Sequence, residues 1–128
     1  RPVTLVPGIK GVSFPISTRR EEAQKFFNQG LAFVYAFNHD EAVRSFRKAA
    51  EIDPASPMPH WGIALALGPN INQDLDAERH REAFAAIQRA SDLAVRAPAR
   101  ERAYVAALAK RYSNAPDADL KKLAVDYR

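Results

Sequence analysis

Apolar and small residues recur at helical spacing from Ala23 to Pro54, first along one stretch and then along a second. Residues three and four positions apart fall on one face of an α-helix, so this spacing predicts two amphipathic helices that pack together. Gly30 stands where these helices would cross closely, and Pro54 ends the second one. The same face returns 34 residues later, because Phe26, Gln29, Gly30 and Phe33 are followed at that offset by His60, Ile63, Ala64 and Leu67. A chain with such a period is predicted to build its core by stacking helix pairs.

The first repeat also carries a specific residue pattern. Six of the seven positions of W-x2-L-G-x2-Y…A-x3-F…P are met in kind, by Phe26, Gly30, Phe33, Ala42, Phe46 and Pro54. Gln29 stands at the Leu position and departs from the pattern. The chain therefore resembles the tetratricopeptide repeat (TPR) family. The resemblance implies an all-α fold, a TPR-type α-α superhelix of about three antiparallel helix pairs with an extended N-terminal arm.

We expect the chain to divide into an extended arm at 1–17, TPR repeat 1 at 18–56, TPR repeat 2 at 57–97 and an incomplete TPR repeat 3 at 98–128. Repeat 2 is expected to contain a loop insertion at 68–76, a segment rich in Gly, Pro, Asn and Asp. Helices are expected over about 19–36, 39–52, 57–67, 77–96 and 98–112, with a sixth from about 117. The sixth is unfinished at the last residue, so we expect further repeats or another chain to cover this end.

Side chains that favour helix N-termini precede three of these helices. Thr18 and Glu21 have the spacing of a capping box, Asn38 precedes the second helix, and Ser56 precedes the third. Before the first helix, prolines and glycines exclude regular helix, while the apolar residues are too many for a free tail. We therefore expect the arm to lie across the first helices and cover their end.

Longer sequence words resemble a family of large bacterial TPR proteins. These words are FPIST at 14–18, QGLAFVYAFNHDEAVRSFRKAAEIDP at 29–54, HWGIALALGPNIN at 60–72 and ERAYVAALAKRYS at 101–113. Members of that family are typically several times longer and many look exported, so the resemblance implies that this chain is part of a longer array. Their role is largely undefined, and the resemblance therefore informs the fold rather than the function.

Composition limits the possible partners. The 128 residues contain no cysteine, which excludes disulfides and thiolate metal sites and fits an exported (periplasmic) or a cytoplasmic protein equally well. No apolar run is long enough to span a membrane. The net charge is +4, but the basic residues alternate with acidic ones, a pattern typical of solvated helix faces. We therefore expect neither a nucleic-acid partner nor membrane insertion.

The sequence contains no phosphate-binding loop, no nucleophile elbow and no HExxH motif. His39 lies beside Asp40 and Glu41, which we interpret as a polar helix start, since a catalytic zinc site needs three well-placed ligands. His60 is expected to be half-buried and structural, and His80 to be solvated. We thus predict no enzyme activity, no metal and no cofactor. The alternative is a metal-dependent or small-molecule-dependent enzyme that uses His39 and the GPNIN segment.

The predicted function is a protein–protein interaction module or scaffold that binds a peptide or a partner helix on the concave TPR face. Apolar anchors are predicted on the inner helices, and amide side chains in the insertion; these candidate binding residues are Phe27, Leu31, Tyr35, Trp61, Asn70 and Asn72. Two alternatives remain open: the arm or the next helix buries the aromatic residues, and the two asparagines brace only their own loop.

A third possible function is self-association. The expected sixth helix carries apolar residues without a following repeat, namely Leu120, Leu123, Ala124 and Tyr127. Such a face favours a homo-oligomer formed through the C-terminal helices.

Overall fold

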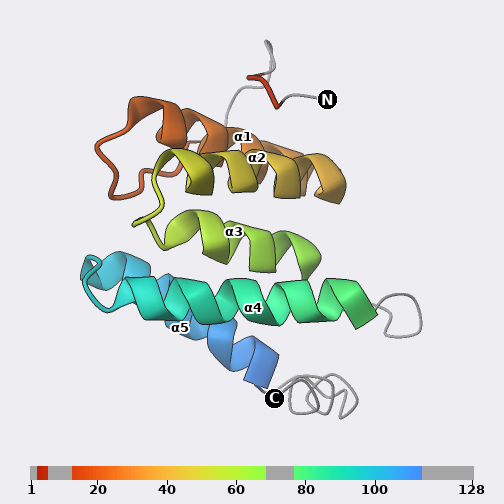
Figure 1. Ribbon diagram of the computed structural model, residues 1–128, viewed down its shortest axis with the longest axis vertical. Helices are drawn as coiled ribbons and strands as arrows, with labels where there is room; N and C mark the ends of the chain where they lie inside the picture. Colours follow the sequence, from red (N-terminus) through yellow and green to blue (C-terminus); the bar gives the residue numbers. More distant parts are fainter. Residues whose placement is uncertain (1–2, 6–12, 69–76, 114–128) are drawn as a thin grey trace.

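A computed structural model describes residues 3–5, 13–68 and 77–113. The secondary structure in these ranges consists of α1 (Glu21–Tyr35), α2 (His39–Ile52), α3 (Met58–Leu67), α4 (Ala77–Ala94) and α5 (Ala99–Ser113), with no strand (Figure 1). The fold of the described part is therefore all-α. The sixth helix, most of the 68–76 insertion and the apolar C-terminal residues lie outside the described residues.

The five helices stack in chain order along the long axis of the molecule, and successive helices run in opposite directions (Figure 1). Each helix packs against the next one, and contacts also join α1 to α3 and α3 to α5. The odd-numbered helices therefore form one layer and α2 and α4 form a second. Short connections favour this arrangement: the segments 36–38, 53–57 and 95–98 hold three to five residues, a length typical of antiparallel neighbouring helices.

The centre of the first three helices is the ring of Phe46, which is fully buried. A Cβ atom added to Gly30 would lie 2.5 Å from this ring, and one added to Gly62 would lie 2.6 Å from it. One glycine on α1 and one on α3 thus leave room for the same aromatic ring of α2. The predicted close crossing at Gly30 is confirmed.

The junction of α1 and α2 is a helix end of the Schellman type. The amide of Asn38 donates to the carbonyl of Phe33, and the amide of Phe37 donates to that of Val34. Phe37 has a φ of 60°, a conformation that favours glycine, and its side chain is 84% exposed. The side chain of Asn38 then accepts from the amide of Glu41 at 3.4 Å, which confirms the predicted cap of α2.

Two other predicted caps are wrong. The N-cap of α1 is Arg20, and the Thr18 hydroxyl instead accepts from the Arg20 amide and donates to Asp53 at the C-terminal end of α2. The Thr18 side chain, which was expected to cap α1, therefore bonds a residue 35 positions away instead. Ser56 is buried and makes no cap bond, since α3 begins after Pro57 instead.

Candidate functional site

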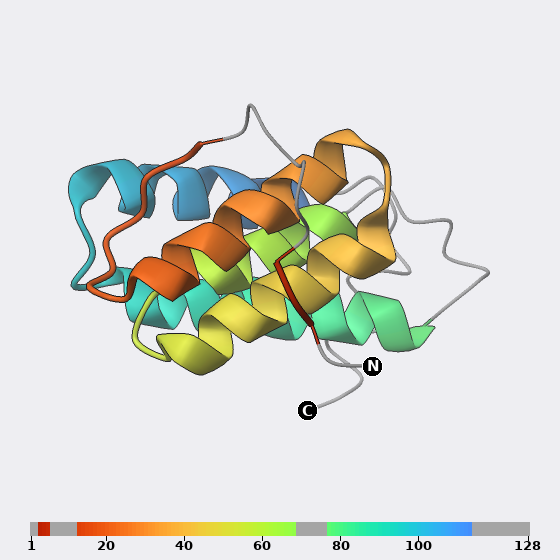
Figure 2. The same ribbon diagram turned by 90° about the horizontal axis from the view of Figure 1, so that it is seen from above.

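The part of the arm that precedes α1 crosses the layer of odd-numbered helices and runs between α1 and α5 (Figure 2). Its aromatic side chain, Phe14, contacts rings from all three helices of that layer. The ring centroid of Phe14 lies 5.8 Å from Phe27 of α1, 6.0 Å from Trp61 of α3 and 5.2 Å from Tyr104 of α5. Two aromatic residues predicted as anchors of an inner face therefore meet a segment of the same chain.

Helix α1 binds the backbone of the arm. The amide group of Gln24 makes two bonds, accepting from the Ile16 amide at 2.8 Å and donating to the Phe14 carbonyl at 2.7 Å. One turn further, the side-chain oxygen of Asn28 accepts from the Phe14 amide at 3.1 Å and from the Gln24 side chain at 3.0 Å. These bonds use only main-chain groups of the arm, so they select an extended backbone and not a particular side chain.

Helix α5 supplies the charged contacts. Both carboxylate oxygens of Glu101 accept from Ser17, one from its amide at 2.5 Å and the other from its hydroxyl at 2.8 Å. The Glu101 residue is only 4% exposed. A buried carboxylate is costly without donors, so these two bonds from Ser17 are what makes the position of Glu101 tolerable.

The neighbouring residue on α5, Arg100, covers the other side of the arm. Its guanidinium lies 4.6 Å from the centroid of the Phe14 ring and 5.8 Å from that of Tyr104. It also donates to the carbonyl of Pro15 at 3.3 Å. A guanidinium above an aromatic face is attracted by the ring quadrupole, and Arg100 thereby holds Phe14 against the helices.

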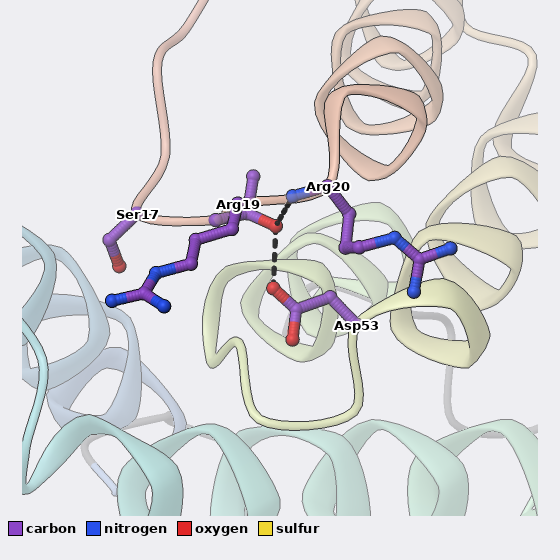
Figure 3. Close-up of a pocket in the computed structure, with 5 residues that line it drawn as sticks. Ser17, Arg19, Arg20 and Asp53 are labelled. Carbon is purple, nitrogen blue, oxygen red and sulfur yellow. Dashed lines mark hydrogen bonds between the residues drawn. The ribbon is translucent and has the colours of Figure 1, made fainter.

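The arm leaves this site at a polar hollow of about 390 Å³, lined by Ser17, Thr18, Arg19, Arg20 and Asp53 (Figure 3). Thr18 fixes the turn here, since its hydroxyl donates to Asp53 at 2.5 Å. The guanidinium of Arg20 donates to the carbonyl of Ile52 at 3.3 Å. These bonds tie the C-terminal end of the arm to the end of α2. They fix the position of the arm at the point where it joins α1.

We refer to the helical residues that contact Phe14, Pro15, Ile16 and Ser17 as the arm-binding face; they are Gln24, Phe27 and Asn28 of α1, Trp61 of α3, and Arg100, Glu101 and Tyr104 of α5. Sequence reasoning found Phe27 and Trp61 but missed the polar members. Their signal was available: Gln24, Asn28 and Leu31 share one face of α1 with Phe27, at spacings of three and four residues.

The other predicted binding residues have different positions. Leu31 is buried in the core together with Phe27 and Trp61, and the arm lies above the two aromatic residues. Tyr35, in the last turn of α1, is 70% exposed and remains accessible. Asn70 and Asn72 lie outside the described residues. The structure thus brings Phe27 and Trp61 together, and it shows the arm covering them.

The three histidines do not form a common site. His60 is half-buried as expected, and burial, together with the nearby Arg89, lowers its pKa below the usual value. The prediction for His80 is wrong, since this residue is 1% exposed and packs inside the helix layers. Within the described ranges, no three His, Asp or Glu side chains are grouped closely enough to hold a metal ion. No helix in those ranges has both the length and the apolar character needed to cross a membrane.

Comparisons with protein-family models, with curated proteins and with solved structures found no match for this chain. The arguments for its function therefore come from the arm-binding face and its contacts.

Proposed function

We propose that the chain is a TPR-type interaction module whose inner helices bind an extended peptide segment of a partner protein. The alternating helix directions, the contacts of α1 with α3 and α3 with α5, and the glycine-mediated crossing at Phe46 support a TPR-type superhelix. In such a superhelix the first helix of each pair lines the concave face. The arm-binding face belongs to those helices.

One observation carries this proposal: an extended segment, Phe14 to Ser17, already lies on the face and is bound there as a peptide ligand would be. Its main chain is held by Gln24, Asn28 and Arg100, and its aromatic side chain contacts rings of the helices. Main-chain bonds that supply affinity, combined with a pocket for one side chain, are the general chemistry of extended-peptide recognition.

Tyr35 extends the candidate surface beyond the part that the arm covers. It lies two turns after Phe27 on α1, and its ring is exposed. Exposed tyrosines are common anchors in binding sites, because a rigid ring gives a large contact area at low entropic cost. We therefore include Tyr35 in the proposed surface as the place where a longer peptide continues.

A displayed library of random peptides tests the proposal with the full chain. We expect recovered peptides to bind the full chain with Phe14→Ala, in which the arm competes less, and to lose at least about ten-fold in affinity when Gln24→Ala is added, the loss of two hydrogen bonds to a peptide main chain. The control is Gln88→Ala on α4, an exposed residue whose side chain donates to the exposed Asp92 on the same helix. The proposal fails if no peptide binds, or if Gln24→Ala and Gln88→Ala have the same effect on every peptide recovered.

A further inference from the structure

We propose that residues 14–17 are a built-in ligand of the arm-binding face, and that a partner displaces them with a segment of the pattern aromatic–Pro–aliphatic–Ser. This inference rests on the function proposed above and names both the class of partner segment and the regulation of the site. The arm would then keep the site closed until a competing segment arrives.

The contacts of the arm define the pattern. An aromatic residue is needed where Phe14 meets Phe27, Trp61 and Tyr104. An aliphatic residue is needed at Ile16, which is buried in the core cluster. Pro15 is exposed and makes no side-chain hydrogen bond, but a proline restricts the preceding residue to extended geometry, which is the geometry that Gln24 binds.

Glu101 determines the last position of the pattern. Its two oxygens accept from the amide and the hydroxyl of Ser17, and the carboxylate is buried. A competing segment without a hydroxyl at this position would leave one buried carboxylate oxygen of Glu101 without the hydrogen bond that Ser17 donates. Such a segment would therefore bind more weakly. A small hydroxyl residue is therefore preferred there over alanine.

Two features make the arm a removable ligand, although Ile16 belongs to the core cluster. Every hydrogen bond between residues 14–17 and the helices involves a helix side chain, so α1, α3 and α5 keep their main-chain bonds when the arm leaves. The side chain of Phe14 is only partly buried, whereas Phe27 and Phe46 beneath it are fully buried. Because the arm is tethered, its high effective concentration lowers the apparent affinity of any free competitor.

Fluorescence anisotropy of a labelled peptide with the sequence of residues 13–18, SFPIST, tests the inference. We expect weak binding to the full wild-type chain and binding at least about ten-fold tighter to the full chain with Phe14→Ala, because that change raises the fraction of open sites. Two altered peptides serve as matched controls. SAPIST, which lacks the aromatic side chain, should bind at least about ten-fold more weakly than SFPIST. SFPIAT, which lacks the hydroxyl, should bind more weakly than SFPIST to the chain with Glu101. The difference in affinity between these two peptides should be smaller for the chain with Glu101→Gln.

The possible results separate this inference from the proposed function. If Phe14→Ala is folded and binds SFPIST no better than the wild type, the inference is overturned, while library peptides that depend on Gln24 would still support the proposed function. If Phe14→Ala is unfolded, restoration of its helical circular dichroism by SFPIST supports the inference, and failure of the peptide to restore it overturns the inference. A wild-type dimer that Phe14→Ala abolishes would overturn it as well, because the occupant would then be the arm of a second copy.

Discussion

Replacement of Gly30 by alanine tests the packing on which the helix stack depends. The added Cβ would lie 2.5, 2.6 and 2.8 Å from three carbons of the Phe46 ring. The ring has little room to move, since a Cβ added to Gly62 would also lie 2.6 Å from Cδ1 and Cε1 of Phe46, and the side chain is fully buried. Overpacking of a core costs about 1–3 kcal/mol, and a fully buried ring with little room to move places the cost at the upper end, about 3 kcal/mol.

Helix propensity acts in the opposite direction. Alanine in place of glycine inside a helix stabilises by about 1 kcal/mol. The two effects together predict that Gly30→Ala lowers the free energy of unfolding by about 2 kcal/mol. Urea denaturation followed by far-UV circular dichroism measures this value, because a two-state domain of this size gives it by linear extrapolation.

A double-mutant cycle with Phe46→Leu shows whether the ring is the cause. Leucine lacks the outer ring carbons, so we expect the penalty of Gly30→Ala to shrink by at least about 1 kcal/mol in the Phe46→Leu background. The reasoning is refuted if Gly30→Ala stabilises the wild-type chain by about 1 kcal/mol, the value of helix propensity alone. It is refuted equally if the penalty is the same in both backgrounds.

Three further predictions concern separate regions. Phe37→Gly should raise the free energy of unfolding by about 1 kcal/mol, because glycine adopts a φ of 60° without strain, whereas Phe37→Ala should give no such gain in the same denaturation experiment. Burial raises the pKa of the Tyr112 phenol, whose hydroxyl donates to the carbonyl of Ala64 at 2.5 Å, and the neutral form is therefore favoured in the folded state. The contribution of Tyr112 to the stability of the folded state should be constant below the unfolded pKa of tyrosine, about 10, and should decrease as the pH rises above that value. Melting temperatures measured across alkaline pH should therefore fall less steeply for Tyr112→Phe than for the wild type. Finally, sedimentation should show concentration-dependent association of the chain that Phe14→Ala leaves unchanged, since the apolar hollow of about 220 Å³ between α4 and α5 is lined by residues outside the arm-binding face, such as Ala94 and Val105; a strictly monomeric profile would contradict this.

The sequence predicted the helices well, because their positions depend on local spacing. Apolar residues three and four apart, Asn38 before α2 and Pro54 after it are all features that act within a few residues. The predicted helix bounds therefore differ from those of α1 to α5 by at most two residues at each end. The arm was also predicted to cover the helices, because its apolar residues required a surface.

Features that depend on distant contacts were not predictable in this way. Thr18 bonds Asp53 and Ser17 bonds Glu101, partners 35 and 84 residues away, and no local pattern indicates either pair. His80 stands among charged residues in the sequence. It is nevertheless buried, on a helix, α4, that packs against α3 and α5. For the polar half of the candidate site, the spacing of Gln24 and Asn28 places them on the same face as Phe27, but it does not identify the backbone segment that they bind.

The central claim is that the arm leaves its binding face without unfolding of the helices, and native-state hydrogen exchange of the full chain measures this directly. The amides of Phe14, Ile16 and Ser17 each donate to a helix side chain, so they are protected only while the arm is bound. We predict that these amides exchange through a local opening whose free energy is much smaller than that for amides in the buried core of α2. The free energy of this local opening should not change with low concentrations of denaturant. Exchange of the arm amides at the same free energy and denaturant dependence as the α2 core would contradict the claim, because the arm would then open only when the whole protein unfolds.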